Sequence, residues 1–155
     1  MKYICPLITV KDMNISKYFY QNILNQKIKE DYDQNVVFEG DFSIHLQSHY
    51  AMLIERHEIK SGGNNFELYF EENDLESLQL KLKQHKVDFL HEIKVQPWQQ
   101  KVLRIFDPDK NIIEVGESLQ NVCLRLKNEG KSIEEIMEMT SLSMNYVKNA
   151  LENDI

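Results

Sequence analysis

The order of apolar and polar segments repeats once along this chain, and the repeat restricts the folds that the chain can adopt. Residues 2–10 are rich in apolar and β-branched side chains, which predicts a strand. Residues 14–25 then place apolar side chains on one face of a helix. Three short β-type runs follow, at 27–32, 36–39 and 42–47. The first part of the chain is therefore expected to have the order β-α-β-β-β.

The same order starts again after a polar linker that contains two adjacent glycines. Residues 66–70 predict a strand, and leucines at helical spacing then predict a helix over 75–82. Three more strands are expected at 88–94, 102–106 and 112–115. A repeated order of elements indicates an internal duplication. We therefore predict an α+β fold in which two β-α-β-β-β modules, residues 1–49 and 64–117, form one domain over 1–117.

Only helical patterns follow the second module. An apolar stripe at helical spacing over 119–126 ends before a glycine, which is a natural helix stop. Ser132 and Glu135 form the capping-box pattern that opens a second helix, and a third is expected after Ser143. We predict a three-helix appendage over 118–155 that covers a sheet edge or a subunit interface.

Composition excludes several classes of protein. Of the 155 residues, 42% are hydrophobic and 28% are charged, which is typical of a folded globular chain and not of a disordered one. The net charge of −7 opposes broad contact with nucleic-acid phosphates. Cys5 and Cys123 show no CxxC spacing, and no run approaches the roughly 20 apolar residues that span a bilayer. A cytoplasmic protein without a membrane or nucleic-acid partner is expected.

Four runs of residues, taken together, indicate a superfamily. They are PLITVKD at 6–12, FYQNIL at 19–24, FELYFEEND at 66–74 and DPDKNIIEV at 107–115. In this order they resemble the vicinal oxygen chelate superfamily of glyoxalases, bleomycin-resistance proteins and dioxygenases. The resemblance covers about residues 2–117. It implies that the curved mixed sheets of two modules enclose a cavity for a small molecule, and that the protein is a homodimer.

Two positions depart from the pattern of the family. Lys110 follows the Asp-Pro-Asp turn where the family has glycine, so Lys110 or Asn111 is expected to adopt the positive φ angle that glycine favours. Gln99 follows Trp98 where similar members have glycine, and a different loop shape is expected there. Trp98 is interpreted either as a flat wall of the pocket or as an anchor in the core.

Alternation along the predicted strands separates polar from apolar side chains, because residues two apart share a face of the sheet. The polar side chains that are expected to face the cavity are His45, Glu67, Tyr69, Arg104 and Glu114. His45, Glu67, Arg104 and Glu114 are expected to converge there.

The resemblance also implies a metal site. Its four ligand positions fall on Cys5, His45, Asn65 or Glu67, and Glu114. Cys5 stands where the family usually has histidine and would bind only as a thiolate. A divalent zinc, nickel or manganese ion would chelate two substrate oxygens, and Glu67 or Glu114 would be the catalytic group that moves a proton in a lyase or isomerase step.

Each of these residues also has a structural interpretation. His45 is equally a buried histidine that bonds to Glu67 or Glu114, and an ion pair with Arg104 would satisfy Glu114 without catalysis. Cys5 is also interpreted as a small buried residue. The remaining histidines are expected to be solvated or structural, and they are His49, His57, His85 and His91.

A second function fits the same pattern. In a metal-free binding protein like the antibiotic-sequestering members, Trp98, Tyr69 and Phe38 would stack on an apolar ligand, while Arg104 and Glu67 orient it. A third hypothesis is a transcription regulator, because the last two predicted helices resemble a helix-turn-helix. The segment from Glu117 to the end holds more acidic than basic residues, which favours the other two hypotheses.

Overall fold

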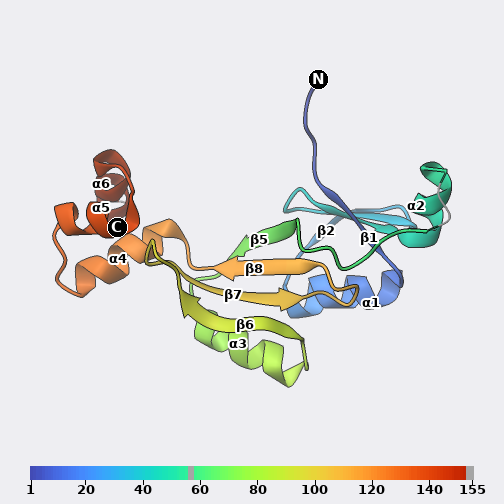
Figure 1. The fold of residues 1–155 in the computed structure, drawn as a ribbon. Coiled ribbons are helices and arrows are strands. Elements are labelled where there is room, and N and C mark those ends of the chain that lie inside the picture. Colours follow the sequence, from blue (N-terminus) through green and yellow to red (C-terminus); the bar gives the residue numbers. More distant parts are fainter. Residues whose placement is uncertain (56–57, 153–155) are drawn as a thin grey trace. The chain divides into compact units, whose positions relative to one another are not determined.

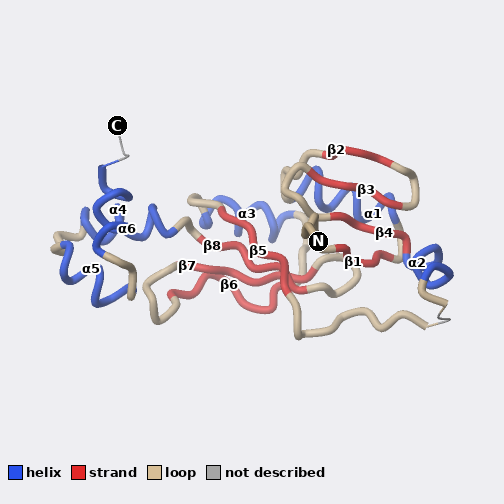
Figure 2. The backbone as a smooth tube through the Cα atoms, turned by 90° about the horizontal axis from the view of Figure 1, so that it is seen from above, coloured by secondary structure: helices blue, strands red, loops and turns tan. Residues whose placement is uncertain are grey.

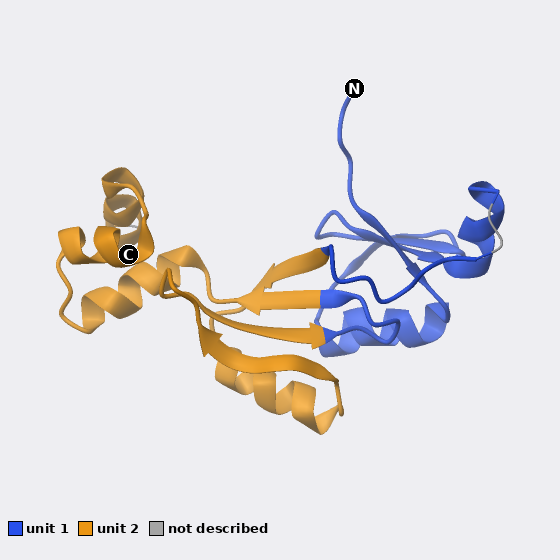
Figure 3. Cartoon of the chain, viewed as in Figure 1, with its two compact units in different colours: residues 1–66, 106–112 blue, residues 67–105, 113–155 orange. Residues whose placement is uncertain are grey.

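The computed structural model describes residues 1–55 and 58–152, so His57 lies outside the described part of the chain. The chain divides into two compact units (Figure 3). The first comprises residues 1–66 and 106–112, and the second comprises residues 67–105 and 113–155. The loop between the last two strands of the second module therefore belongs to the first unit.

The first unit contains a four-stranded sheet in the order β1-β4-β3-β2 (Figure 2). Its strands are β1 (Leu7–Val10), β2 (Ile28–Asp31), β3 (Asn35–Phe38) and β4 (Ser43–Leu46). β1 and β4 are parallel, with Thr9 opposite His45, and the other two pairs are antiparallel. The predicted strands are confirmed, and the parallel pair fixes the position of His45 in the middle of the sheet.

The helix of the first unit begins where the sequence predicts it. The Asp12 carboxylate caps the helix by accepting hydrogen bonds from the N–H groups of Asn14 and Ile15 at 2.9 and 3.0 Å. α1 (Met13–Tyr18) continues as the π-helical turn η1 (Phe19–Ile23). This turn buries Tyr20, whose ring lies 5.5 Å from the ring of Phe38 between centroids.

The second unit repeats the strand order of the first, β5-β8-β7-β6 (Figure 1). Its strands are β5 (Glu67–Glu71), β6 (Phe89–Val95), β7 (Lys101–Phe106) and β8 (Ile112–Gly116). The helix α3 (Leu75–Gln84) lies beside β6 and buries Leu75 and Leu82 completely. The equal order of the two sheets confirms the duplication of the β-α-β-β-β module.

Three helices complete the second unit and gather at one end of it (Figure 2). They are α4 (Leu119–Asn128), α5 (Ile133–Thr140) and α6 (Met144–Glu152). The capping box of Ser132 and Glu135 is present, and the apolar stripes of the three helices pack into one core with Val122, Leu126 and Ile136 at its centre. The predicted three-helix appendage is confirmed. Within the described residues, no helix is long and apolar enough to cross a membrane.

One helix was not predicted from the sequence. α2 (Gln47–Leu53) follows β4 directly, and none of its residues is fully buried. A sequence pattern reveals a surface helix through the apolar stripe that it buries. α2 buries no such stripe, so its sequence carries little signal.

The Asp-Pro-Asp turn is held together by a buried carboxylate. Asp107 is 2% exposed, and its oxygens accept hydrogen bonds from the Tyr20 hydroxyl at 2.9 Å and from the backbone N–H groups of Asp109 and Asn111. Burial and the charge of Asp107 raise the pKa of Tyr20 well above its ordinary value. The Tyr20 hydroxyl therefore stays protonated and remains a donor to Asp107.

Both positions where the family has glycine adopt left-handed backbone angles. Lys110 has φ 68°, which confirms the expectation for this turn, and Gln99 has φ 69°. Each loop therefore adopts a backbone conformation that glycine would favour. The backbone of Lys110 and Gln99 is strained in this conformation, because both residues have a Cβ atom.

The Lys110→Gly variant should be more stable than the Lys110→Ala variant. Both variants lose the contact between the Lys110 ammonium and the Phe106 ring. Only glycine removes the cost of the left-handed angle for a residue with a Cβ atom, roughly 1 kcal/mol. Urea unfolding followed by circular dichroism should give the higher free energy of unfolding for Lys110→Gly. Equal values for Lys110→Gly and Lys110→Ala would contradict the left-handed turn.

Candidate functional site

His45 lies in the first unit and is part of a polar chain. It is 7% exposed, and its Nδ1 atom lies 3.1 Å from the Asn35 side-chain nitrogen. Its Nε2 atom lies 2.8 Å from Nδ1 of His49, the third residue of α2, and the two imidazole rings are stacked. His49 was expected to be solvated or structural, and the structure gives it a direct contact with a candidate site residue.

These contacts engage both ring nitrogens of His45. With the Asn35 amide nitrogen as donor, Nδ1 of His45 accepts, so Nε2 carries the proton and donates to His49. Burial, and secondly the nearby His49, lower the pKa of His45. Both effects favour the neutral imidazole, and both of its ring nitrogens have a hydrogen-bonding partner within the first unit.

Cys5 lies in the same unit but in a different environment. Its thiol is half-buried and lies 3.9 Å from the Ser43 hydroxyl, as a weak donor. A metal ligand has to be a thiolate, which a neighbouring cation or metal stabilises. The Ser43 hydroxyl is neutral, so its contact with Cys5 offers no such stabilisation.

Arg104 organises the polar side chains of the second unit. Its guanidinium donates to Glu67 at 2.9 Å and forms an ion pair with Glu114. Its Nη1 atom lies 3.3 Å from Nε2 of His91, which is opposite Arg104 on β6. The ion pair of Glu114 with Arg104, which was the structural interpretation of Glu114, is present, and Glu67 joins it.

This cluster combines buried and exposed charges. The side chain of Glu114 is 9% exposed, that of Arg104 is 23% exposed, and that of Glu67 is 39% exposed. A buried carboxylate needs a charged or hydrogen-bonded partner, and Arg104 supplies it to Glu114. One guanidinium lies between two carboxylates, so these three side chains together carry one net negative charge.

Tyr69 lies on the same face of the second sheet as Glu114. A Cβ atom added to Gly116, two residues after Glu114 on β8, would lie 3.3 Å from the Tyr69 ring. Residues two apart on a strand share a face, so Glu67 and Tyr69 on β5 also lie together. We call the face that carries Glu67, Tyr69, Arg104 and Glu114 the polar face of the second sheet.

Gln100 joins Tyr69 to Trp98. The Gln100 amide donates to the Tyr69 hydroxyl at 2.9 Å and accepts from the Trp98 indole N–H at 2.8 Å. Tyr69 and Trp98 are 48% and 41% exposed, whereas Gln100 is buried. Trp98 is therefore not a core anchor. Gln100 was missed in the sequence, because an isolated glutamine has no motif that would single it out.

Phe38 does not belong to the site that was expected for it. Its side chain is fully buried and stacks on Phe42 with ring centroids 4.6 Å apart. Tyr20 packs against both rings. The expectation that Phe38 stacks on a ligand is wrong, because its ring is used in the core of the first unit.

The residues do not fit a divalent metal ion as they are placed within each unit. In the first unit both nitrogens of His45 are engaged, and in the second the Arg104 cation occupies the position beside Glu67 and Glu114 that a metal cation would need. Among the described residues, no group of three His, Cys, Asp or Glu side chains is suited to hold a metal ion.

Comparisons with known proteins agree with the fold. The family described as Glyoxalase-like domain matches residues 3–120. A crystal structure of a protein of unknown function from Agrobacterium tumefaciens is 39% identical, with a TM-score of 0.71, over 77% of this chain and 95% of that one. None of the curated proteins matches the chain significantly.

Two more distant structures show the fold alone. Lactoylglutathione lyase from Agrobacterium tumefaciens is 18% identical, with a TM-score of 0.59, over 76% of this chain and 95% of the lyase. A member of the glyoxalase/bleomycin resistance protein/dioxygenase superfamily from Sphaerobacter thermophilus is 21% identical, with a TM-score of 0.57, over 76% of this chain and 98% of that one.

The protein should become less stable as the pH is lowered through the titration range of unfolded histidine, because of His45. The unfolded chain binds a proton on this residue below about pH 6.5, whereas the folded protein resists it because the pKa of His45 is lowered. Lower pH therefore favours the unfolded state. Urea titrations from neutral to mildly acidic pH should show a weaker decline for His45→Gln than for the parent. An equal decline in the parent and in His45→Gln would contradict this origin of the pH dependence.

Removing Arg104 should leave Glu114 as an uncompensated buried charge. We expect Arg104→Met to lower the free energy of unfolding by about 2 to 3 kcal/mol. Adding Glu114→Gln should restore part of this loss, because it removes the charge. Glu67→Gln should cost less than about 1 kcal/mol, since Glu67 is partly exposed. Thermal or urea unfolding of these three variants and of Glu114→Gln alone measures these differences, and additive effects of Arg104→Met and Glu114→Gln would contradict the pairing.

Proposed function

Because this chain belongs to the glyoxalase-like domain family, we propose that it binds a small organic molecule, and that it does so on the polar face of the second sheet without a metal ion. The observation that carries the proposal is the position of Arg104 between Glu67 and Glu114. The guanidinium supplies the positive charge that a metal ion would otherwise bring to these carboxylates.

The charges of this face favour a ligand that carries a cation. The charges of Glu67, Glu114 and Arg104 sum to one negative charge. Glu71 adds a second negative charge at the end of β5, the strand that carries Glu67. Glu67 is the accessible carboxylate of the cluster, with 39% of its side chain exposed. A ligand ammonium or amidinium would bind its free oxygen lone pairs, whereas an oxyanion would meet repulsion from both glutamates.

The exposed aromatic rings favour a ligand with a flat apolar part. Tyr69 lies two residues from Glu67 on β5, and its hydroxyl is fixed by Gln100, which also holds the Trp98 indole. Rigid aromatic side chains bind planar groups by stacking, and they attract cations through their ring faces. A planar aromatic cation therefore suits the combination of Glu67 with Tyr69 and Trp98.

A metal-dependent lyase or isomerase is the second candidate. It would use His45 and Glu114, with Cys5 or Glu67, to hold zinc, nickel or manganese, and Glu67 or Glu114 to move a proton. The family membership supports it, but His45 would have to leave His49 or Asn35, and Glu114 would have to leave Arg104. The metal-free function requires neither rearrangement.

The remaining expectations follow from family likeness. A homodimer is proposed on that basis alone. A cytoplasmic location stays a prediction. A nucleic-acid partner is not proposed, because the chain carries a net charge of −7.

Benzamidine and benzoate provide a matched test, because they share a ring and differ in charge. We expect benzamidine to raise Tm and benzoate to leave it unchanged, since a ligand at about ten times its Kd adds about 1.4 kcal/mol to folding stability. The effect should persist in EDTA and should be lost in Glu67→Gln. Differential scanning fluorimetry measures it. Glu30→Gln, at an exposed residue of the first unit, serves as the control and should respond as the parent does.

Two results would contradict this proposal. Equal stabilisation by benzoate and benzamidine would exclude recognition of the cation. Stabilisation that needs added zinc, nickel or manganese, disappears with EDTA and is absent in His45→Ala and Glu114→Gln would favour the metal-dependent function instead.

A further inference from the structure

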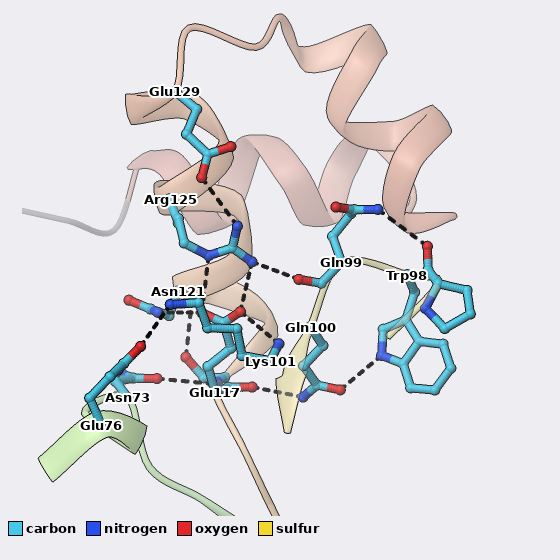
Figure 4. A network of polar contacts seen from close by, with 12 residues as sticks. Asn73, Glu76, Trp98, Gln99, Gln100, Lys101, Glu117, Asn121, Arg125 and Glu129 are labelled. Atoms are coloured by element: carbon cyan, nitrogen blue, oxygen red, sulfur yellow. Dashed lines mark hydrogen bonds and ion pairs between the residues drawn. The ribbon is translucent and has the colours of Figure 1, made fainter. Parts of the chain in front are cut away.

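Glu117 is a buried carboxylate at the point where the second sheet joins α4. Its side chain is 2% exposed, and it accepts hydrogen bonds from the Lys101 backbone N–H at 2.9 Å and from the Asn121 amide at 2.7 Å (Figure 4). Arg125 donates to both of its oxygens, at 2.7 and 3.4 Å. Burial raises the pKa of Glu117, but the bonds from Arg125, Lys101 and Asn121 outweigh burial and lower it overall.

Arg125 also holds the loop that carries Trp98. Its Nη2 atom donates to the backbone oxygen of Gln99 at 2.6 Å (Figure 4). Gln99 is the residue with φ 69°, and the loop around it is closed by backbone hydrogen bonds between Gln96 and Gln100 and between Gln99 and Gln96. One guanidinium of α4 therefore fixes both the buried carboxylate and the strained position of the loop.

The Gln100 amide transmits this arrangement to the aromatic side chains. Its nitrogen donates to the backbone oxygen of Glu117 at 2.7 Å and to the Tyr69 hydroxyl, while its oxygen accepts from Trp98. The indole N–H can only donate and the backbone oxygen can only accept. The orientation of the amide is therefore determined. Both N–H groups of the amide and its oxygen form hydrogen bonds inside the protein.

We infer that α4, the first C-terminal helix, supports the binding site, with Arg125 as a positioning residue. Arg125 holds Glu117 and the Gln99 backbone, these hold Gln100, and Gln100 sets the distance and orientation between Trp98 and Tyr69. This role rests on the proposed function for the use of these two rings. It assigns to α4 a task beyond covering a sheet edge, because it makes the shape of the ligand platform depend on the appendage.

Trp98 is the only tryptophan of the chain, so its fluorescence reports on this network without a ligand. Replacing Arg125 alone would leave Glu117 charged, buried and unpaired. We therefore choose the double variant Glu117→Gln/Arg125→Met, which removes the pair together. Gln100→Met is an independent second variant that loses the bonds to Trp98 and Tyr69 but leaves the ion pair intact.

The control is Glu129→Gln. Glu129 is the other carboxylate that Arg125 contacts, at 3.3 Å, and it is exposed at the C-cap of α4. This variant changes the charge near Arg125 but leaves Glu117, Gln99 and Gln100 in place. Far-UV circular dichroism and Tm of each full-length variant establish that it is folded.

In both the double variant and Gln100→Met, we expect Trp98 to become more accessible to acrylamide quenching and to shift its emission. Fluorescence titration should show that the Kd for benzamidine rises by about tenfold. A change of this size is typical of the loss of one hydrogen bond. Glu129→Gln should match the parent in quenching and in affinity. Should the double variant fail to fold, Arg125→Lys tests the role of Arg125 instead, because lysine keeps a positive charge beside Glu117 but lacks the guanidinium that contacts both Glu117 and Gln99.

The outcomes separate this inference from the proposed function. Folded variants with the quenching and emission of the parent would overturn the positioning role, whether or not benzamidine binds. Altered Trp98 fluorescence in both variants, together with no binding of benzamidine to the parent, would support the positioning of Trp98 and reject the proposed ligand class. Weaker binding with unaltered fluorescence would also overturn the positioning role.

Discussion

The second unit depends on the burial of one carboxylate, that of Glu117. A buried charge is unfavourable unless donors surround it, and here donors come from the start of β7 and from two successive turns of α4. The sheet and the appendage are thus joined by an ion pair with directed hydrogen bonds, and not only by apolar packing. Directed bonds specify geometry more narrowly than apolar contact does. The Trp98 loop inherits that geometry through Arg125.

The same physical solution recurs in the first unit. Asp107 is buried in the turn between β7 and β8, and its oxygens are satisfied by Tyr20 and by the turn's own N–H groups. Tyr20 in turn packs on the aromatic core of this unit. A segment from late in the sequence is thereby fixed to the early helix. In both units a satisfied buried carboxylate determines where a loop lies.

The polar face of the second sheet illustrates how charge pairing limits chemistry. Arg104 stabilises Glu114, which would otherwise be an isolated buried charge, and this pairing occupies the carboxylate that family likeness assigns to a metal. Glu67 is paired with Arg104 as well but remains accessible. The first unit shows a parallel limit, because His45 uses both ring nitrogens within the protein. These arrangements are the basis of the proposed metal-free binding.

The sequence by itself determined the two modules, their strands and most of their helices, because apolar periodicity, caps and turn residues are local signals. The pairing of Glu114 with Arg104 was one of the interpretations that the sequence allowed, since a buried charge needs a partner, and the left-handed turn near Lys110 was expected from the family resemblance. Only the tertiary structure decided which polar groups meet. The contacts of His49 with His45, of Gln100 with Tyr69 and of Arg125 with Gln99 join residues through folding, and no local pattern encodes them. Phe38 was misplaced for the same reason: alternation separates the two faces of a strand, but the packing of distant elements decides which face is covered.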